Sequence, residues 1–197
     1  EETMEPAFGL PALWIHEAYR ERAELSGYTV VDPISVLATH LTEVVKGHCD
    51  ELLGRQDVQT LIDSVKQDHP AVVSELVPAM LSVGDIQKVL VCLLKERVSV
   101  RDLVSIMETL ADTATFTKDP EVLAEYVRRT LSRNISRQYI QNNTLTCITL
   151  DPQTENQIVS GVQHSDRGSF VNLDPGSMQQ FINSLSSEIQ KLTATGF

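Results

Sequence analysis

The stretch YTVVDPISVLATH, residues 28–40, changes its pattern at one dipeptide and indicates how the chain is built. Residues 28–31 are a short run rich in β-branched side chains, which is typical of a strand. At Asp32-Pro33, the Asp side chain can accept hydrogen bonds from the first turn of a helix, and Pro is well tolerated at the first helical position. We expect this helix to run to about residue 53 and to end at Gly54.

The Asp-Pro pair recurs at residues 119–120, 151–152 and 174–175, and we expect a helix to begin at each pair. Two of these pairs follow short apolar or alternating runs, residues 145–150 and 169–173. We predict that these runs are two strands of one sheet, with a polar turn at residues 164–168. The helices that follow are expected over residues 120–138, 152–162 and 175–192.

Between residues 55 and 132, apolar residues recur every three or four positions, which is typical of amphipathic helices. Breaks near residues 70, 78, 84, 99 and 115–118 divide this region into four or five helices. Asp85 and Ser99 are the expected N-caps of two of them.

The pattern therefore predicts a multidomain α+β protein. Residues 1–32 are expected to be part of an α/β subdomain, with a strand at 13–15 and a helix at 17–26. Residues 33–54 are a helix, residues 55–132 an all-helical domain, and residues 133–197 a small C-terminal α/β domain. The N-terminal α/β region is partial, because two short strands bury too little surface to be stable alone.

Charge argues against a nucleic-acid partner, and hydropathy argues against a membrane-spanning helix in this sequence. The 197 residues carry a net charge of −11, with acids in excess at both ends and basic residues interleaved with acids in the middle. Such a surface repels a phosphate backbone, so we predict no nucleic-acid binding. No run approaches the roughly 18–20 apolar residues of a membrane-spanning helix.

The three cysteines, Cys49, Cys92 and Cys147, are widely spaced and predict free thiols rather than a disulfide framework. Cys92 and Cys147 lie in apolar runs and are expected in the core. Cys49 adjoins His48, but neighbouring residues of a helix point about 100° apart and cannot form a nucleophile–base pair. We therefore predict no catalytic residue.

Metal and cofactor sites are also not expected. On the helix after Pro33, His40 and Glu43 have the spacing of helical metal ligands, but two ligands do not make a site. The glycines are scattered and form no phosphate-binding loop.

Two aromatic residues near the N-terminus differ in their surroundings. Trp14 lies between Leu13 and Ile15 and is expected in the core. Phe8 lies among Pro and Gly residues, in an irregular segment that can present the ring at the edge of a groove.

Four spaced segments carry a resemblance to a known family: EPAFGLPALWI (5–15), YTVVDPISVLATH (28–40), ELLGRQ (51–56) and TKDP (117–120). They resemble the cytoplasmic region of the FHIPEP family, the export-gate proteins of flagellar and injectisome type III secretion. The resemblance runs in order from about residue 5 to 139 and more loosely to 197. It implies that residues 33–54 return to a first domain encoded upstream, and that a membrane-spanning part precedes this fragment.

The resemblance also implies a partner-binding site. In the family, the segment that matches residues 5–8 and the Thr that matches Thr39 line a hydrophobic dimple that docks export chaperones. Carried over to this chain, the site comprises Glu5, Phe8 and Thr39, and Glu5 stands where an Asp is usual. Val31 and Val36 are expected walls, because Val36 lies one helical turn from Thr39.

The function that the resemblance implies is a non-enzymatic docking platform of the flagellar type III export gate. Its partners would be flagellar export chaperones with filament-type cargo, other export-apparatus components, and further copies in a ring that is usually ninefold. Its place would be the cytoplasmic face of the bacterial inner membrane. Three alternatives stay open: an injectisome paralogue, a cysteine-dependent enzyme, and a helical adaptor unrelated to secretion.

Overall fold

The computed structural model describes residues 1–165 and 168–194, and it has the predicted α+β class. The chain divides into two compact units, Glu1–Ser132 and Arg133–Phe197. Helices dominate both units, and the strands among the described residues form three two-stranded sheets.

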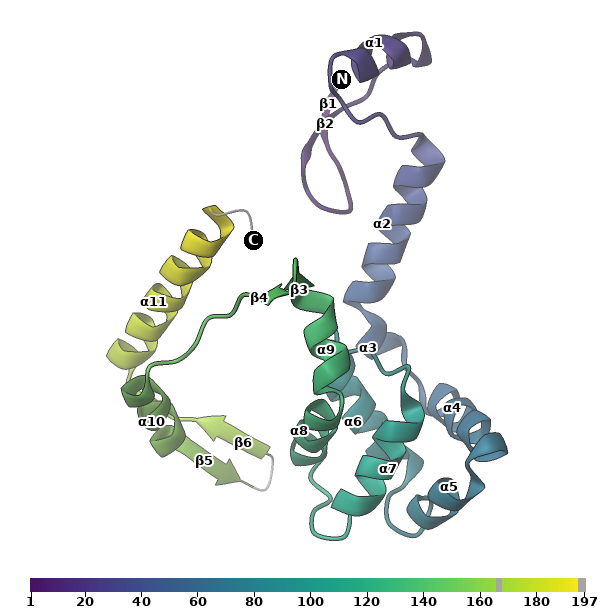
Figure 1. Ribbon diagram of the computed structural model, residues 1–197, viewed down its shortest axis with the longest axis vertical. Helices are drawn as coiled ribbons and strands as arrows, with labels where there is room; N and C mark the ends of the chain where they lie inside the picture. The colour runs from purple at the N-terminus through teal and green to yellow at the C-terminus, as the bar shows by residue number, and fades with distance from the viewer. Residues whose placement is uncertain (166–167, 195–197) are drawn as a thin grey trace. The chain divides into compact units, whose positions relative to one another are not determined.

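The first unit begins with an antiparallel hairpin of β1 (Glu2–Met4) and β2 (Pro11–Leu13), followed by η1 (Glu17–Tyr19) and α1 (Arg20–Leu25) (Figure 1). The helix predicted at residues 17–26 is confirmed. The strand predicted at residues 28–31 is wrong. The Tyr28 N–H donates to the Ala23 carbonyl at the end of α1, at 3.1 Å, and residues 28–31 join none of the described sheets.

The helix expected from Pro33 is split in two. Helix α2 (Pro33–Gly47) ends before His48, whose backbone leaves the helical region with φ −123° and ψ 19°. Helix α3 (Cys49–Leu52) follows and packs against the helical region that comes next.

Residues 55–132 are helical as predicted, and the described residues of this region contain no strand. The helices are α4 (Arg55–Asp68), α5 (Pro70–Leu76), α6 (Val83–Lys95), α7 (Leu103–Thr113) and α8 (Pro120–Thr130). Helix α6 contacts α4 and α8, and α7 contacts α5 and α8 (Figure 1). Their apolar faces supply the buried core, which includes Leu76, Ile86, Leu90, Leu93, Ile106, Met107, Leu110 and Leu123.

Two predicted helix starts in this region are wrong by a few residues. The N-cap of α6 is Ser82 rather than Asp85, which lies in the first turn and accepts hydrogen bonds from Ser82. The N-cap of α7 is Asp102 rather than Ser99, because the Asp102 carboxylate accepts the Ser105 N–H.

The second unit consists of short hairpins and helices. Its elements are α9 (Ser132–Tyr139), β3 (Ile140–Gln141), β4 (Thr144–Leu145), α10 (Pro152–Gly161), β5 (Val162–Ser165), β6 (Gly168–Val171) and α11 (Pro175–Ala194). The single helix predicted over residues 120–138 is interrupted at Leu131, between α8 and α9.

The prediction that residues 145–150 and 169–173 share one sheet is wrong. Strand β4 pairs with β3, and β6 pairs with β5, so each pair is a local hairpin. Asn142 and Asn143 form the turn between β3 and β4 with φ of 49° and 61°, the left-handed backbone that a tight two-residue hairpin requires. Within the expected polar turn, residues 166 and 167 lie outside the described residues.

Candidate docking site

The turn between β1 and β2 is held by the carboxylate of Glu5. Its oxygens accept the Ala7 N–H at 3.0 and 3.1 Å and the Phe8 N–H at 2.7 Å. Gly9 closes the turn with φ +65°, a left-handed backbone that suits glycine, and donates its N–H to the Glu5 carbonyl at 2.9 Å. The Phe8 side chain is 62% exposed at this turn.

The start of α2 is fixed by Asp32. One carboxylate oxygen accepts the Ile34 and Ser35 N–H groups at 3.1 and 3.0 Å, and the other accepts the Ser35 hydroxyl at 2.6 Å. These bonds, chiefly that of the Ser35 hydroxyl, hold the pKa of Asp32 below its ordinary value. Val31 precedes this cap and is 50% exposed.

Val36 and Thr39 lie on one face of α2, because residues three apart are neighbours on a helix. Val36 is half-buried and Thr39 is exposed. The five predicted site residues thus come from two segments: the hairpin turn with Glu5 and Phe8, and the start of α2 with its preceding Val31. The structure orders each segment locally, and a dimple that combines them stays a prediction.

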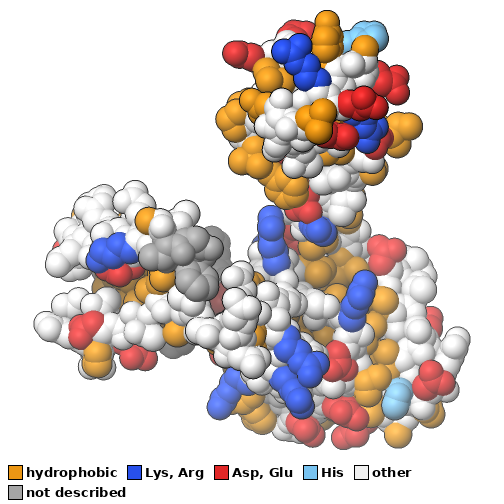
Figure 2. All heavy atoms as spheres, turned by 45° about the horizontal axis from the view of Figure 1, so that its top comes forward, with side chains coloured by type: hydrophobic (Ala, Val, Ile, Leu, Met, Phe, Trp, Pro, Cys, Tyr) orange, Lys and Arg blue, Asp and Glu red, His pale blue; other side chains and the backbone are white. Residues whose placement is uncertain are grey.

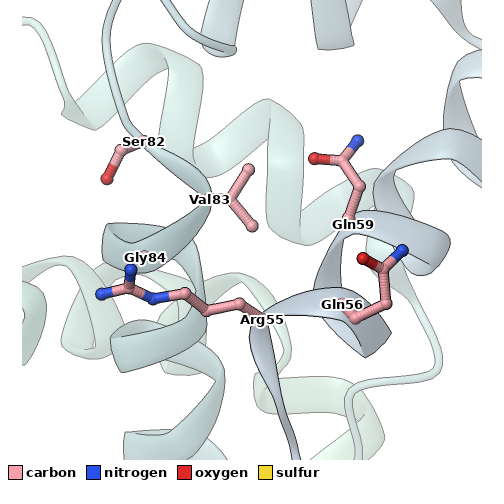
Figure 3. Close-up of a pocket in the computed structure, with 6 residues that line it drawn as sticks. All are labelled: Arg55, Gln56, Gln59, Ser82, Val83 and Gly84. Carbon is pink, nitrogen blue, oxygen red and sulfur yellow. The ribbon is translucent and has the colours of Figure 1, made fainter.

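Two hollows among the described residues are lined by other side chains. One, of about 400 Å³, lies between the first turns of α4 and α6 and is lined by Arg55, Gln56, Gln59, Ser82, Val83 and Gly84 (Figure 3). The other, of about 760 Å³, lies between α10 and the start of α11, and polar uncharged side chains dominate its lining. Neither hollow includes a predicted site residue.

Trp14 is not in a core, contrary to the expectation. Its side chain is 50% exposed, because β1 and β2 form a two-stranded ribbon that buries little surface. Hydrophobic side chains are interspersed with charged ones over this N-terminal region (Figure 2, top).

The sequence reasoning missed an apolar surface on α2. Ile34, Leu37, Leu41, Val44 and Val45 are all at least 42% exposed, and α2 contains no buried residue. The signal was available in their spacing of three and four residues, which places them along one side of a helix.

The cysteines give no catalytic arrangement in the described part of the chain. The Cys49 thiol points to the Leu94 carbonyl at 4.0 Å, while His48 Nδ1 lies 3.0 Å from a Glu51 oxygen. All three thiols are free. Cys147 is exposed rather than in the core, since residues 146–150 are not in a strand that could bury it.

The described residues contain no group of three potential metal-binding side chains. Among the same residues, no helix combines the length and the apolar character that crossing a bilayer requires.

Comparison with known sequences gives a match over the whole chain. The pattern of the FHIPEP family matches residues 1–197. Flagellar biosynthesis protein FlhA of Bacillus subtilis is 47% identical over 193 residues, which are 98% of this chain and 28% of that protein. The protein of the same name from Borreliella burgdorferi is 44% identical over 194 residues, again 98% of this chain and 28% of the relative. The chain therefore spans about 28% of the length of these relatives.

Solved structures share the fold. The Chlamydia pneumoniae CdsV protein matches with a TM-score of 0.81 and 28% identity, over 91% of this chain and 52% of that one. CdsV in its complex with CdsO gives a TM-score of 0.80 at 27% identity, over 88% and 51%. The nonameric EPEC SctV-C gives 0.74 at 30% identity, over 87% and 53%.

Proposed function

The chain belongs to the FHIPEP family, and from this premise we propose that it is part of a non-enzymatic docking platform of the flagellar type III export gate. In this role it binds flagellar export chaperones that carry filament-type cargo. The observation that carries the proposal is the 47% identity to a flagellar biosynthesis protein over 98% of the chain.

The flagellar assignment is favoured over an injectisome paralogue by the degree of similarity. The two flagellar relatives are 47% and 44% identical, whereas CdsV and SctV-C are 28% and 30% identical. A cysteine-dependent enzyme is disfavoured, because the Cys49 thiol faces a backbone carbonyl rather than a base.

The docking site that we propose comprises Glu5, Phe8, Val31, Val36 and Thr39. Phe8 supports this placement, since an exposed aromatic ring on an ordered turn is the kind of residue that dominates interfaces. Glu5 orders the turn through backbone N–H groups, so its role is to position Phe8.

Assembly and location are proposed from the relatives. A protein of the same fold is nonameric, and another forms a complex with CdsO. By this analogy, we propose that the whole protein forms a ring of nine copies and contacts other export-apparatus components. We also propose that it lies at the cytoplasmic face of the bacterial inner membrane. By the same analogy, we propose that the membrane-spanning part of the protein is encoded upstream of this chain.

Calorimetric titration with a cargo-loaded flagellar export chaperone tests the docking proposal. Phe8→Ala is expected to weaken binding by about 30-fold, which corresponds to about 2 kcal/mol, because a central aromatic ring is lost. Thr39→Met is expected to do the same by filling the pocket. Both variants should melt at nearly the wild-type temperature, since neither residue is buried.

Phe116→Ala is the matched control, because Phe116 is 64% exposed on the helical region and lies outside the proposed site. Its affinity should equal that of the wild type. Unchanged affinity in folded Phe8→Ala and Thr39→Met variants would place the docking site elsewhere. If the protein binds an injectisome chaperone instead of the flagellar one, the alternative that it is an injectisome paralogue is favoured.

A further inference from the structure

The loop between α7 and α8 carries an exposed aromatic ring that packs against α8, and the two helices lie side by side (Figure 1). The rings of Phe116, in this loop, and Tyr126, on α8, meet edge to face, with 5.5 Å between their centroids and an angle of 72° between their planes. The Arg129 guanidinium lies 6.0 Å from the centroid of the Tyr126 ring, within the range of a cation–π attraction. We call these three residues, together with Val122 one helical turn before Tyr126, the aromatic cluster.

The aromatic cluster lies on the solvent side of α8. The side chains that α8 buries belong to Leu123, Ala124 and Val127. Val122, Tyr126 and Arg129 are spaced by four and three residues, so they lie together on the other side of the helix. Phe116 is 64% exposed, Val122 41% and Tyr126 37%. The cluster therefore adds little to the core, and the stability of the fold does not explain why these rings are ordered at the surface.

The positive charge of the aromatic cluster has no carboxylate partner within the described part of the chain. The adjacent Arg128 forms ion pairs with Glu96 and Glu125. Arg129 forms an ion pair with none of the described residues, and its guanidinium lies over the Tyr126 ring instead. A guanidinium in this position keeps its N–H donors free for a carboxylate, which it can bind through two parallel hydrogen bonds. The cluster thus offers one cationic contact beside three apolar ones.

We propose that the aromatic cluster docks an acidic amphipathic helix of another protein, which places a carboxylate on Arg129 and apolar side chains on Phe116, Val122 and Tyr126. Tyr and Arg are enriched among the residues that dominate protein interfaces, and aromatic rings supply a large contact area. From Val122 to Arg129 the cluster extends about 10 Å along α8, at about 1.5 Å per residue, so about two turns of a partner helix match its length.

Charge favours this occupant over a nucleic acid or an anionic membrane. Glu121 and Glu125 lie on the same helix as the cluster, and the chain carries a net charge of −11. These charges repel a dense row of phosphates. A single carboxylate can still pair with Arg129, because exposed charges more than about 8 Å away are largely screened at physiological salt. The expected partner therefore combines a few spaced carboxylates with apolar side chains.

A photo-crosslinking derivative of phenylalanine in place of Phe116, in the whole protein in living cells, tests the proposal. We expect a crosslink to a segment of another protein in which acidic and apolar residues recur at helical spacing. The same amino acid in place of Leu25, which is 90% exposed on α1, is the control and should not give this product. A crosslink to another copy of this chain, a crosslink to a neutral or basic segment, or no crosslink would overturn the proposal.

Charge reversal shows whether Arg129 takes part in the contact. Arg129→Glu should lower the yield of the crosslink at least about tenfold, because the guanidinium that pairs with the partner's carboxylate is replaced by a like charge. Arg22→Glu is the matched control, because it makes the same change of charge on an exposed side chain of α1, and its yield should equal that of the wild type. Both variants should keep the wild-type melting temperature. A yield that Arg129→Glu leaves unchanged would contradict the proposal.

A synthetic peptide with the sequence of the crosslinked segment gives an independent readout in a calorimetric titration. Replacing each of its carboxylates by the corresponding amide should weaken binding at least about tenfold, and so should Phe116→Ala in the protein. Equal affinity of the two peptides would show that charge does not select the partner.

The result is separable from that of the docking proposal, because Phe116→Ala should leave the affinity for the flagellar chaperone unchanged. If this variant weakened chaperone binding, the aromatic cluster would belong to the chaperone site, and the proposal of a separate partner would be wrong.

Discussion

The carboxylate of Glu5 illustrates how a side chain in a binding segment can act through the backbone. It accepts the N–H groups of Ala7 and Phe8, so it is engaged within its own turn. The resemblance placed an acid at this position. It did not show that the acid bonds the N–H groups two and three residues further on, because those bonds depend on the geometry of the turn.

Replacing Glu5 by Ala should weaken chaperone binding by about tenfold, or about 1.4 kcal/mol, because an unordered turn must be ordered on binding. Glu5→Gln should give an intermediate effect, since its amide oxygen can still accept an N–H. Calorimetry measures the affinity, and hydrogen exchange at Ala7 and Phe8 measures the order of the turn. A loss of affinity without faster exchange at these amides would mean that the carboxylate contacts the partner itself.

The thiols of Cys92 and Cys147 should differ in reactivity. Burial, and next the nearby Glu121 carboxylate, raise the pKa of the Cys92 thiol, so less reactive thiolate is present at a given pH. Cys147 is exposed. Alkylation of the folded protein near neutral pH, followed by mass spectrometry, should modify Cys147 first, and the rate at Cys92 should rise as the pH is raised. Equal rates in the folded state would contradict this order.

At the scale of elements, the sequence predicted the helix starts at the four Asp-Pro pairs, but it did not predict which strands pair. Helices begin at Pro33, Pro120, Pro152 and Pro175, because both the cap and the first helical residue act locally. Strands depend on a partner, and the turn at Asn142-Asn143 selected a neighbouring partner for β4. The Asn-Asn dipeptide was a usable signal for this hairpin.

The first turn of α6 offers a test of capping energetics. Asp85 accepts the Ser82 hydroxyl at 2.6 Å and the Ser82 N–H at 3.2 Å, and the hydroxyl bond is the main cause of a pKa below the ordinary 3.8. Asp85→Ala should therefore lower the free energy of unfolding by about 1 kcal/mol at neutral pH. Thermal or urea unfolding of both proteins measures the difference.

The effect of Asp85→Ala should depend on pH in a defined direction. Because folding lowers the pKa of this carboxyl, its stabilisation is present above the unfolded pKa and is lost as the pH falls through the folded pKa. The stabilities of wild type and variant should thus converge in strong acid, once the pH is below the folded pKa. If the difference in free energy of unfolding between wild type and variant stays constant from neutral to strongly acidic pH, the ionised carboxylate is not the source of the stabilisation.

At the scale of the molecule, the buried core lies in the helices of residues 55–132. The repeated apolar spacing predicted this region, since each helix buries the face that its own sequence defines. The same spacing could not show how much of α2 is covered, and none of its residues is buried in this structure. Nor could local sequence show whether Phe8 and Thr39 meet, since they lie on separate segments.

Leu110→Ala should lower the free energy of unfolding by about 2–5 kcal/mol, because this side chain is fully buried between packed helices and its removal leaves a cavity. Leu25→Ala should have little effect, because Leu25 is 90% exposed. Denaturant unfolding followed by circular dichroism measures the free energy of unfolding of the wild type and of both variants. A large loss for Leu25→Ala would show that α1 is part of the cooperative core.

The local pairing of the strands has a consequence for the speed and order of folding. Each described strand pair, β1–β2, β3–β4 and β5–β6, joins consecutive strands, and the first two are closed by short turns. Proteins dominated by such short-range pairings have low contact order and fold quickly, because little loop-closure entropy is lost before contacts form. During synthesis, each hairpin can therefore close within microseconds of leaving the ribosome, about 1–10 μs by typical hairpin rates, without waiting for a distant strand.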